Sequence, residues 1–157
     1  MSRSARNVVN IVGTLALLFV VSLIVYYIGK NLAPGLLAGG SGVKLNEWQG
    51  AYQTVVSITA GIMCGIYLIY YIVLSFFDEG FNAKRMFWGV LLFFAIVIAF
   101  AMPWIYARIN KLFITGISIS LIFATFYGLI FFWGGTIFTT PILYKYIPIG
   151  AKVIRKK

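Results

Sequence analysis

Four long apolar stretches, separated by short polar segments, constrain this chain more than any other feature. They cover about 8–28, 51–77, 86–107 and 112–138. An α-helix rises 1.5 Å per residue, so about 20 apolar residues suffice to cross the hydrocarbon core of a bilayer. The sequence therefore predicts an all-α integral membrane bundle of four transmembrane helices, forming a single domain over residues 1–157.

The composition independently favours a membrane location. Hydrophobic residues make up 62% of the chain and charged residues only 10%, against roughly 45–50% and 25% in soluble proteins. The mean hydropathy is +0.98. A soluble fold of 157 residues could not bury this much apolar surface. We therefore expect an integral, multi-pass membrane protein.

The connections between the stretches differ in length. The basic leader 1–7 precedes an apolar run longer than the roughly 7–15 residues of a signal-peptide core, so we expect this run to be retained as the first span. The longest connection is predicted over Gly29–Gly50, where Pro34 and several glycines break regular structure. The short turn around 108–111 predicts that spans three and four are antiparallel neighbours.

The charge distribution predicts topology rather than nucleic-acid binding. The chain carries 13 Lys and Arg against three acidic residues, a net charge of +10. These cations lie at the ends of the apolar stretches, which favours anionic lipid headgroups as their partners. Most of them fall in the leader, the connector 78–86 and the residues after 138, so we expect both termini on the cytoplasmic, or equivalent, side. The segment 139–157 is predicted to be a tail on the membrane surface, with the cations Lys145, Lys152, Arg155, Lys156 and Lys157.

Aromatic residues are expected at both membrane interfaces and on the lipid-facing surface. The outer interface is predicted to contain Tyr26, Tyr27, Trp48, Tyr52, Trp104 and Tyr106. The inner interface is predicted to contain Phe77, Phe87, Trp88 and Trp133. The residues expected to face lipid or a partner are Phe93, Phe94, Phe100, Phe123, Phe126, Phe131 and Phe132.

Two rows of small residues predict where helices pack closely. The first row lies on the fourth stretch and comprises Gly116, Ser120, Ala124 and Gly128. The second row lies on the second stretch and comprises Ser57, Gly61 and Gly65. Residues four apart share one face of a helix, and small side chains let membrane helices approach one another. We therefore predict two helix-packing interfaces, either within the bundle or with another subunit.

The sequence offers few groups for catalysis. It contains no histidine and a single cysteine, Cys64, which is interpreted as a small buried hydrophobe. No ionisable residue falls in the middle of a predicted span, which disfavours ion-coupled transport. Asp78 and Glu79 are interpreted as a local ion pair in a turn, or alternatively as a docking contact for a basic partner. We predict no enzymatic activity, no metal site and no cofactor.

Three functional hypotheses fit these observations. The favoured one is a non-catalytic accessory subunit of a larger membrane complex, which packs against other integral membrane subunits through its small-residue helix faces. The second is a self-assembling pore or holin-like membrane protein. The third is a small carrier for lipids or polyisoprenoid lipids. No motif in the sequence indicates a specific activity.

Overall fold

The computed structural model describes residues 3–40, 42–76 and 81–136, and within these ranges it contains helices and no strand. The elements are α1 (Arg3–Leu37), α2 (Leu45–Phe76), α3 (Phe81–Ile109), α4 (Ile117–Phe123) and η1 (Ala124–Gly134). The last two are continuous, and η1 has the wider π-helical winding, which is rare over such a length. The predicted tail 139–157 lies outside the described residues.

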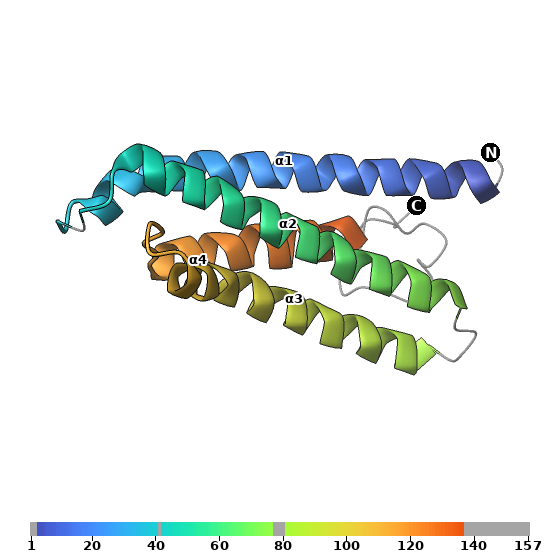
Figure 1. Cartoon of the computed structure of the whole chain (residues 1–157). Helices are drawn as coiled ribbons and strands as arrows, with labels where there is room; N and C mark the ends of the chain where they lie inside the picture. Colours follow the sequence, from blue (N-terminus) through green and yellow to red (C-terminus); the bar gives the residue numbers. More distant parts are fainter. Residues whose placement is uncertain (1–2, 41, 77–80, 137–157) are drawn as a thin grey trace.

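Four segments are long and apolar enough to cross a bilayer, which confirms the predicted four-helix membrane fold. They are Ile11–Leu37, Leu45–Val73, Met86–Ile109 and Ile117–Gly134. Consecutive helices run in opposite directions, so the start of α1 and the end of η1 lie at the same end of the bundle (Figure 1). The linkers 38–44 and 110–116 lie at the other end, which is named the linker end.

The bundle closes on itself. Each helix packs against the next one along the chain, and η1 packs against both α3 and α1. The predicted antiparallel contact between spans three and four is therefore confirmed. Connections of a few residues favour this up-and-down arrangement, because they leave each helix no alternative to packing beside its predecessor.

The first connection is shorter than predicted. The prediction of an irregular segment over Gly29–Gly50 is wrong for most of that range, because only residues 38–44 separate α1 from α2. Pro34 lies in the last turn of α1. A proline lacks its own amide donor but keeps its acceptor, and the Pro34 carbonyl receives a hydrogen bond from the Ala38 N–H at 3.0 Å.

The turn into α2 has two local causes. Gly40 and Gly42 have φ angles of +77° and +69°, a conformation that glycine adopts without strain. Lys44 then precedes the helix: its carbonyl accepts from the Trp48 N–H at 3.0 Å, and its own N–H lies 3.4 Å from a Glu47 carboxylate oxygen. The Glu47 contact is the half of a capping box in which an acidic side chain accepts from the backbone N–H three residues earlier, and it supports the start of the helix.

The linker between α3 and α4 is longer than predicted, because α4 begins at Ile117 and not at Leu112. Asn110 ends α3: its side-chain Oδ1 accepts from the Leu112 N–H and its carbonyl from the Phe113 N–H, both at 3.0 Å. Such local bonds of asparagine compete with helix continuation. The linker then turns Phe113 into the interior, where its side chain is buried.

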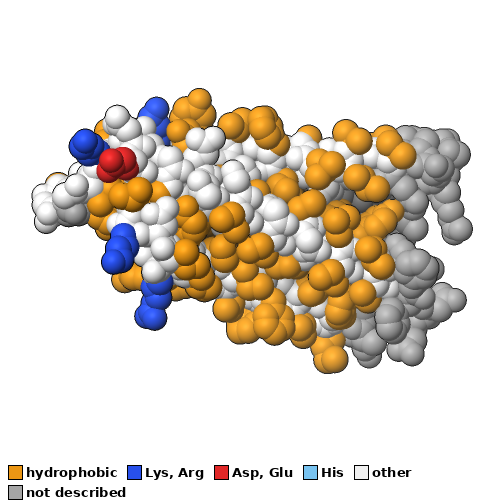
Figure 2. Space-filling view, viewed as in Figure 1, with side chains coloured by type: hydrophobic (Ala, Val, Ile, Leu, Met, Phe, Trp, Pro, Cys, Tyr) orange, Lys and Arg blue, Asp and Glu red, His pale blue; other side chains and the backbone are white. Residues whose placement is uncertain are grey.

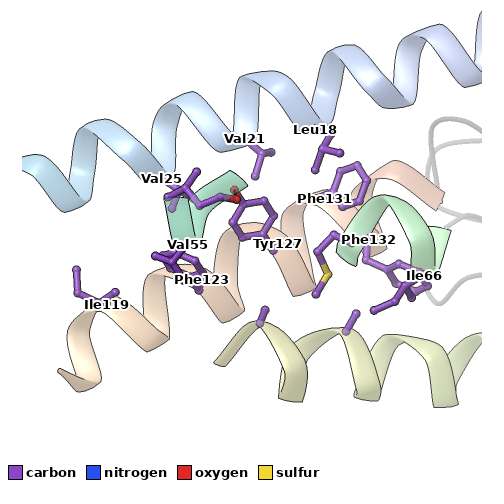
Figure 3. Close-up of a cluster of buried hydrophobic side chains, with 14 of the residues drawn as sticks. Leu18, Val21, Val25, Val55, Ile66, Ile119, Phe123, Tyr127, Phe131 and Phe132 are labelled. Atoms are coloured by element: carbon purple, nitrogen blue, oxygen red, sulfur yellow. Dashed lines mark hydrogen bonds between the residues drawn. The ribbon is translucent and has the colours of Figure 1, made fainter. Parts of the chain in front are cut away.

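Aromatic side chains fill the interior of the bundle. Figure 3 shows Phe123, Tyr127, Phe131 and Phe132 of α4 and η1 directed between α1 and the remaining helices. Phe123, Tyr127 and Phe131 lie four residues apart and Phe132 follows Phe131, so the four side chains share one face of the continuous segment formed by α4 and η1.

Several aromatic placements predicted from the sequence are wrong. Phe123, Phe131 and Phe132 were expected to face lipid or a partner, yet each is completely buried. The three phenylalanines of α3 in the same expectation are exposed, as predicted: Phe93, Phe94 and Phe100. Hydropathy alone cannot separate these two groups, because lipid and protein core are equally apolar.

Some aromatic residues predicted to lie at the membrane interfaces are buried inside the bundle instead. Trp48 and Tyr52 are completely buried rather than interfacial, whereas Trp104 and Tyr27 are exposed. Trp88 is buried as well, and its Nε1–H donates to the Thr136 hydroxyl oxygen at 3.0 Å. A buried indole or phenol usually finds a hydrogen-bond partner, which allows these residues to serve in a core.

Candidate functional site

The first small-residue row contacts two different helices. At Gly128 of η1, an added Cβ would lie 2.7 Å from Ile96 Cγ1 and 2.9 Å from Ile96 Cα, so η1 and α3 approach at backbone distance. At Gly116, the nearest atom is a methyl of Leu36 in α1, at 3.5 Å. Ser120 is completely buried and Ala124 is half-buried. The row therefore lies within the bundle.

The second small-residue row points away from the described bundle. Ser57 and Gly61 are exposed and Gly65 is half-buried. A Cβ added at Gly61 or Gly65 would meet no atom within 4 Å among the described residues. The Ser57 hydroxyl donates to the Gln53 carbonyl at 3.0 Å, within its own helix. This open row leaves a shallow surface on α2 that no described side chain covers.

A groove of about 540 Å³ runs between α1 and α2 beside the open row. Its size falls in the range of small-molecule and cofactor sites. Most of its lining is apolar, and the polar groups come from a few side chains. The lining residues are Leu15, Leu18, Phe19, Ser22, Leu23, Tyr26, Gln53, Val56, Ser57 and Ala60.

The Tyr127 hydroxyl joins the two walls of this groove from inside the bundle. It donates to Ser22 Oγ of α1 at 3.0 Å and lies 3.3 Å from the Val56 carbonyl oxygen of α2. Ser22 in turn donates to the Leu18 carbonyl at 2.8 Å. Figure 3 shows Tyr127 facing α1 among Val21, Val25 and other buried side chains. Sequence reasoning missed this residue, although it is a tyrosine in a row otherwise composed of phenylalanines.

An aromatic cluster fixes α1, α2 and the second linker at the linker end. The rings of Trp48 and Tyr52 stack with centroids 4.8 Å apart, and Phe113 lies against both. The Trp48 Nε1–H donates to the Ile114 carbonyl and the Tyr52 hydroxyl to the Val25 carbonyl, each at 2.8 Å. The groove is therefore attached to a rigid end of the bundle.

The linker end is basic. Its exposed cations are Lys30, Lys44, Arg108 and Lys111, and Glu47 is the one acidic residue within the described part of the chain. Figure 2 shows these charges gathered at this end, while apolar side chains cover the length of the bundle. The described surface therefore combines an apolar belt, compatible with hydrocarbon, with a positively charged linker end.

The described residues contain no group of three His, Cys, Asp or Glu side chains that could hold a metal ion. Cys64 is half-buried and has a free thiol. The acidic pair Asp78 and Glu79 lies outside the described residues. So do the basic tail residues Lys145, Lys152, Arg155, Lys156 and Lys157.

Together, the four apolar helices define a multi-pass, all-α membrane protein. Comparison of the chain with known protein families, with curated proteins and with solved structures finds no match. Two features of this molecule lie open to the surroundings and could bind another molecule: the open row on α2 and the groove beside it.

Proposed function

We propose that this protein is a non-catalytic accessory subunit of a larger membrane complex, and that the open row on α2 receives a transmembrane helix of another subunit. The observation that carries the proposal is the free space at Gly61 and Gly65, where an added Cβ meets no described atom. Small residues at such spacing allow a second helix to approach at backbone distance in a membrane.

The protein itself contains the matching example. Gly128, like Gly61 and Gly65, is a glycine in a row of small residues spaced four apart. There, Ile96 of the neighbouring helix occupies the space beside the glycine. The row on α2 has equivalent small residues with no occupant among the described residues. A partner helix bearing a branched side chain would fit against Gly61 as Ile96 fits against Gly128.

A pore through a single copy receives less support. The interior is filled by large buried side chains, among them Trp48, Tyr52 and Tyr127. The hydroxyls of Ser22, Thr54 and Thr59 donate to carbonyls four residues earlier in their own helices, so they do not form a wet channel lining. A pore would have to form between copies of the chain.

We further propose that both termini lie on the cytoplasmic, or equivalent, side of the membrane. The linker end carries four of the 13 Lys and Arg residues, and the other nine belong to the leader, the connector 78–86 and the segment 139–157, which we expect on the opposite side. The positive-inside rule then orients the bundle. Reaction of a single introduced cysteine at Gly39 with a membrane-impermeant maleimide, from outside intact cells, tests this orientation against the Cys64→Ala background.

The test of the subunit proposal replaces open glycines by leucine at two places on the bundle surface. Gly61→Leu and Gly65→Leu together fill the open row, while Gly13→Leu fills an equally open position on α1. The readout is affinity purification of the full chain from its native membrane in mild detergent, with quantitative mass spectrometry of co-purifying proteins. We expect stoichiometric membrane partners for the parent chain and for Gly13→Leu, and at least tenfold less of them for the double variant. Purification of the parent chain alone, or equal partner recovery from all three, overturns the proposal.

A further inference from the structure

We propose that the groove between α1 and α2 is a binding site for one anionic phospholipid, with an acyl chain between the helices and the headgroup at the linker end. The proposal is independent of the accessory-subunit function. It rests on the lining of the groove, on an exposed amide within a membrane-spanning helix, and on the charge at one end of the groove.

The shape of the groove suits a lipid chain. It extends along α1 from Tyr26 to Leu15, about 16 Å at the rise of an α-helix and roughly half of a ~30 Å hydrocarbon core. This distance corresponds to the depth of one leaflet. Exposed Phe19 and Leu23 stand on the α1 side and would contact the methylene groups of the chain.

Gln53 supplies the first polar contact. Its side chain is exposed within the segment Leu45–Val73, lines the groove, and makes no hydrogen bond within the described residues. An amide without a partner is unfavourable in hydrocarbon, since water is not available to satisfy it. The ester and phosphate oxygens of a phospholipid would accept from this amide, and a purely apolar ligand would not.

Two contacts place Gln53 near the basic end of the groove. Tyr52, the preceding residue, donates to the Val25 carbonyl and packs its ring against Gly29. Gln53 therefore lies within about one turn of Lys30, which is itself four residues after the groove residue Tyr26. An exposed lysine at this position can extend toward the headgroup region while its alkyl chain stays in the apolar layer.

The charge around this end selects among lipids. Lys30 and Lys44 are exposed at the linker end, and the carboxylate of Glu47 already faces the Lys44 backbone N–H. A zwitterionic headgroup carries its own cation and gains little from Lys30, whereas an anionic lipid gains a favourable contact between its phosphodiester and this lysine. The groove therefore favours phosphatidylglycerol-like lipids over phosphatidylcholine.

Native mass spectrometry of the purified full chain tests the proposal, with added phosphatidylglycerol or phosphatidylcholine as the probes. Ser57→Trp fills the groove, and Ile58→Trp places the same side chain at an exposed neighbour that does not line it. Lys30→Gln removes the nearest cation, and Lys111→Gln removes another exposed cation of the same end. Gln53→Leu removes the amide and serves as a second groove variant should Ser57→Trp fail to fold, which circular dichroism shows.

We expect one retained phosphatidylglycerol per parent chain and at least fivefold weaker retention of phosphatidylcholine. Ser57→Trp should lower phosphatidylglycerol retention at least tenfold, and Gln53→Leu and Lys30→Gln about fivefold, while Ile58→Trp and Lys111→Gln behave as the parent. The proposal is overturned if no lipid is retained, if both lipids are retained equally, or if each variant matches its control. Ser57 belongs to both the groove and the open row, whereas Lys30 and Gln53 lie outside the open row. Lys30→Gln and Gln53→Leu should therefore leave partner recovery unchanged, so the two proposals fail separately.

Discussion

The ring of Tyr52 occupies the space beside the Cα of Gly29, where any side chain at that position would have to lie. The same tyrosine donates its hydroxyl hydrogen to the Val25 carbonyl at 2.8 Å, one turn earlier in α1. Glycine at this position therefore permits a phenol from α2 to reach the backbone of α1. This contact holds α1 and α2 together at the end of the groove that is nearest to the aromatic cluster.

Replacement of Gly29 by alanine should destabilise the bundle, because the methyl group overlaps the Tyr52 ring and forces the two helices apart. We expect a loss of about 1–3 kcal/mol, the usual cost of overpacking a core. Thermal denaturation in detergent measures it. The matched variant Gly13→Ala meets open space and should be neutral or stabilising by up to about 1 kcal/mol, since glycine disfavours a helix interior. Equal melting temperatures for the two variants would contradict the contact.

Gly128→Ala should be destabilising by a similar amount, and for a reason that can be separated from side-chain crowding. The new methyl would meet not only the side chain of Ile96 but also its Cα, at 2.9 Å. Ile96→Ala removes the Cγ1 atom that lies 2.7 Å from the added Cβ but keeps the Cα, so Gly128→Ala should destabilise the Ile96→Ala protein as well. Gly134→Ala, also on η1, is the control, because a Cβ added there meets no atom of the described residues within 4 Å. If Gly128→Ala had no effect on stability in the Ile96→Ala protein, backbone approach would not be the limiting contact.

Tyr127→Phe isolates the hydrogen bond that links the groove walls. It removes the hydroxyl shared with Ser22 and Val56 and leaves the buried ring in place. We expect a loss of about 0.5–1.5 kcal/mol, because hydrogen bonds between membrane helices are individually modest. Unfolding in increasing SDS, monitored by circular dichroism, measures this loss. Tyr27→Phe, at an exposed tyrosine on α1, should leave the transition unchanged; a shift equal to that of Tyr127→Phe would assign the effect to tyrosine content alone.

The sequence predicted the number, order and approximate position of the spans because bilayer thickness sets a minimum apolar length. It did not predict where the helices end. Pro34 and the neighbouring glycines indicated a loop over Gly29–Gly50, yet Pro34 is accommodated in a last helical turn and two glycines suffice for the reversal. Helix ends outside the hydrocarbon depend on local hydrogen bonds such as those of Asn110, which hydropathy does not report.

Only part of the candidate site could be predicted from the sequence. The small-residue rows could be identified from their spacing, but not which of them the bundle itself uses: Gly128 meets Ile96, whereas Gly61 meets no described residue. The groove depends on how α1 and α2 diverge, and no local pattern encodes that geometry. The residue that could best have indicated the groove from the sequence is Gln53, whose amide lies inside an apolar stretch. An amide in hydrocarbon is energetically unfavourable unless it has a hydrogen-bond partner.

Trp48 connects α2 to the linker between α3 and α4. Its indole N–H donates to the Ile114 carbonyl, and its ring stacks on Tyr52 and lies against Phe113. Trp48→Phe keeps a ring in the cluster but leaves that carbonyl without its donor, so the linker 110–116 should open more often. Hydrogen–deuterium exchange should rise in this linker by about five- to tenfold, corresponding to about 1–1.5 kcal/mol for one lost hydrogen bond.

Trp104→Phe, at an exposed tryptophan of α3, is the control for that experiment and should leave exchange in the linker unchanged. Exchange in α2 around Tyr67 should be the same in both variants, because the core there does not contact Trp48 and stays packed against Phe131. Faster exchange confined to the linker would show that the aromatic cluster stabilises the linker end locally. Uniformly faster exchange would instead mean that Trp48 supports the whole bundle, and unchanged exchange would show that stacking alone holds the linker in place.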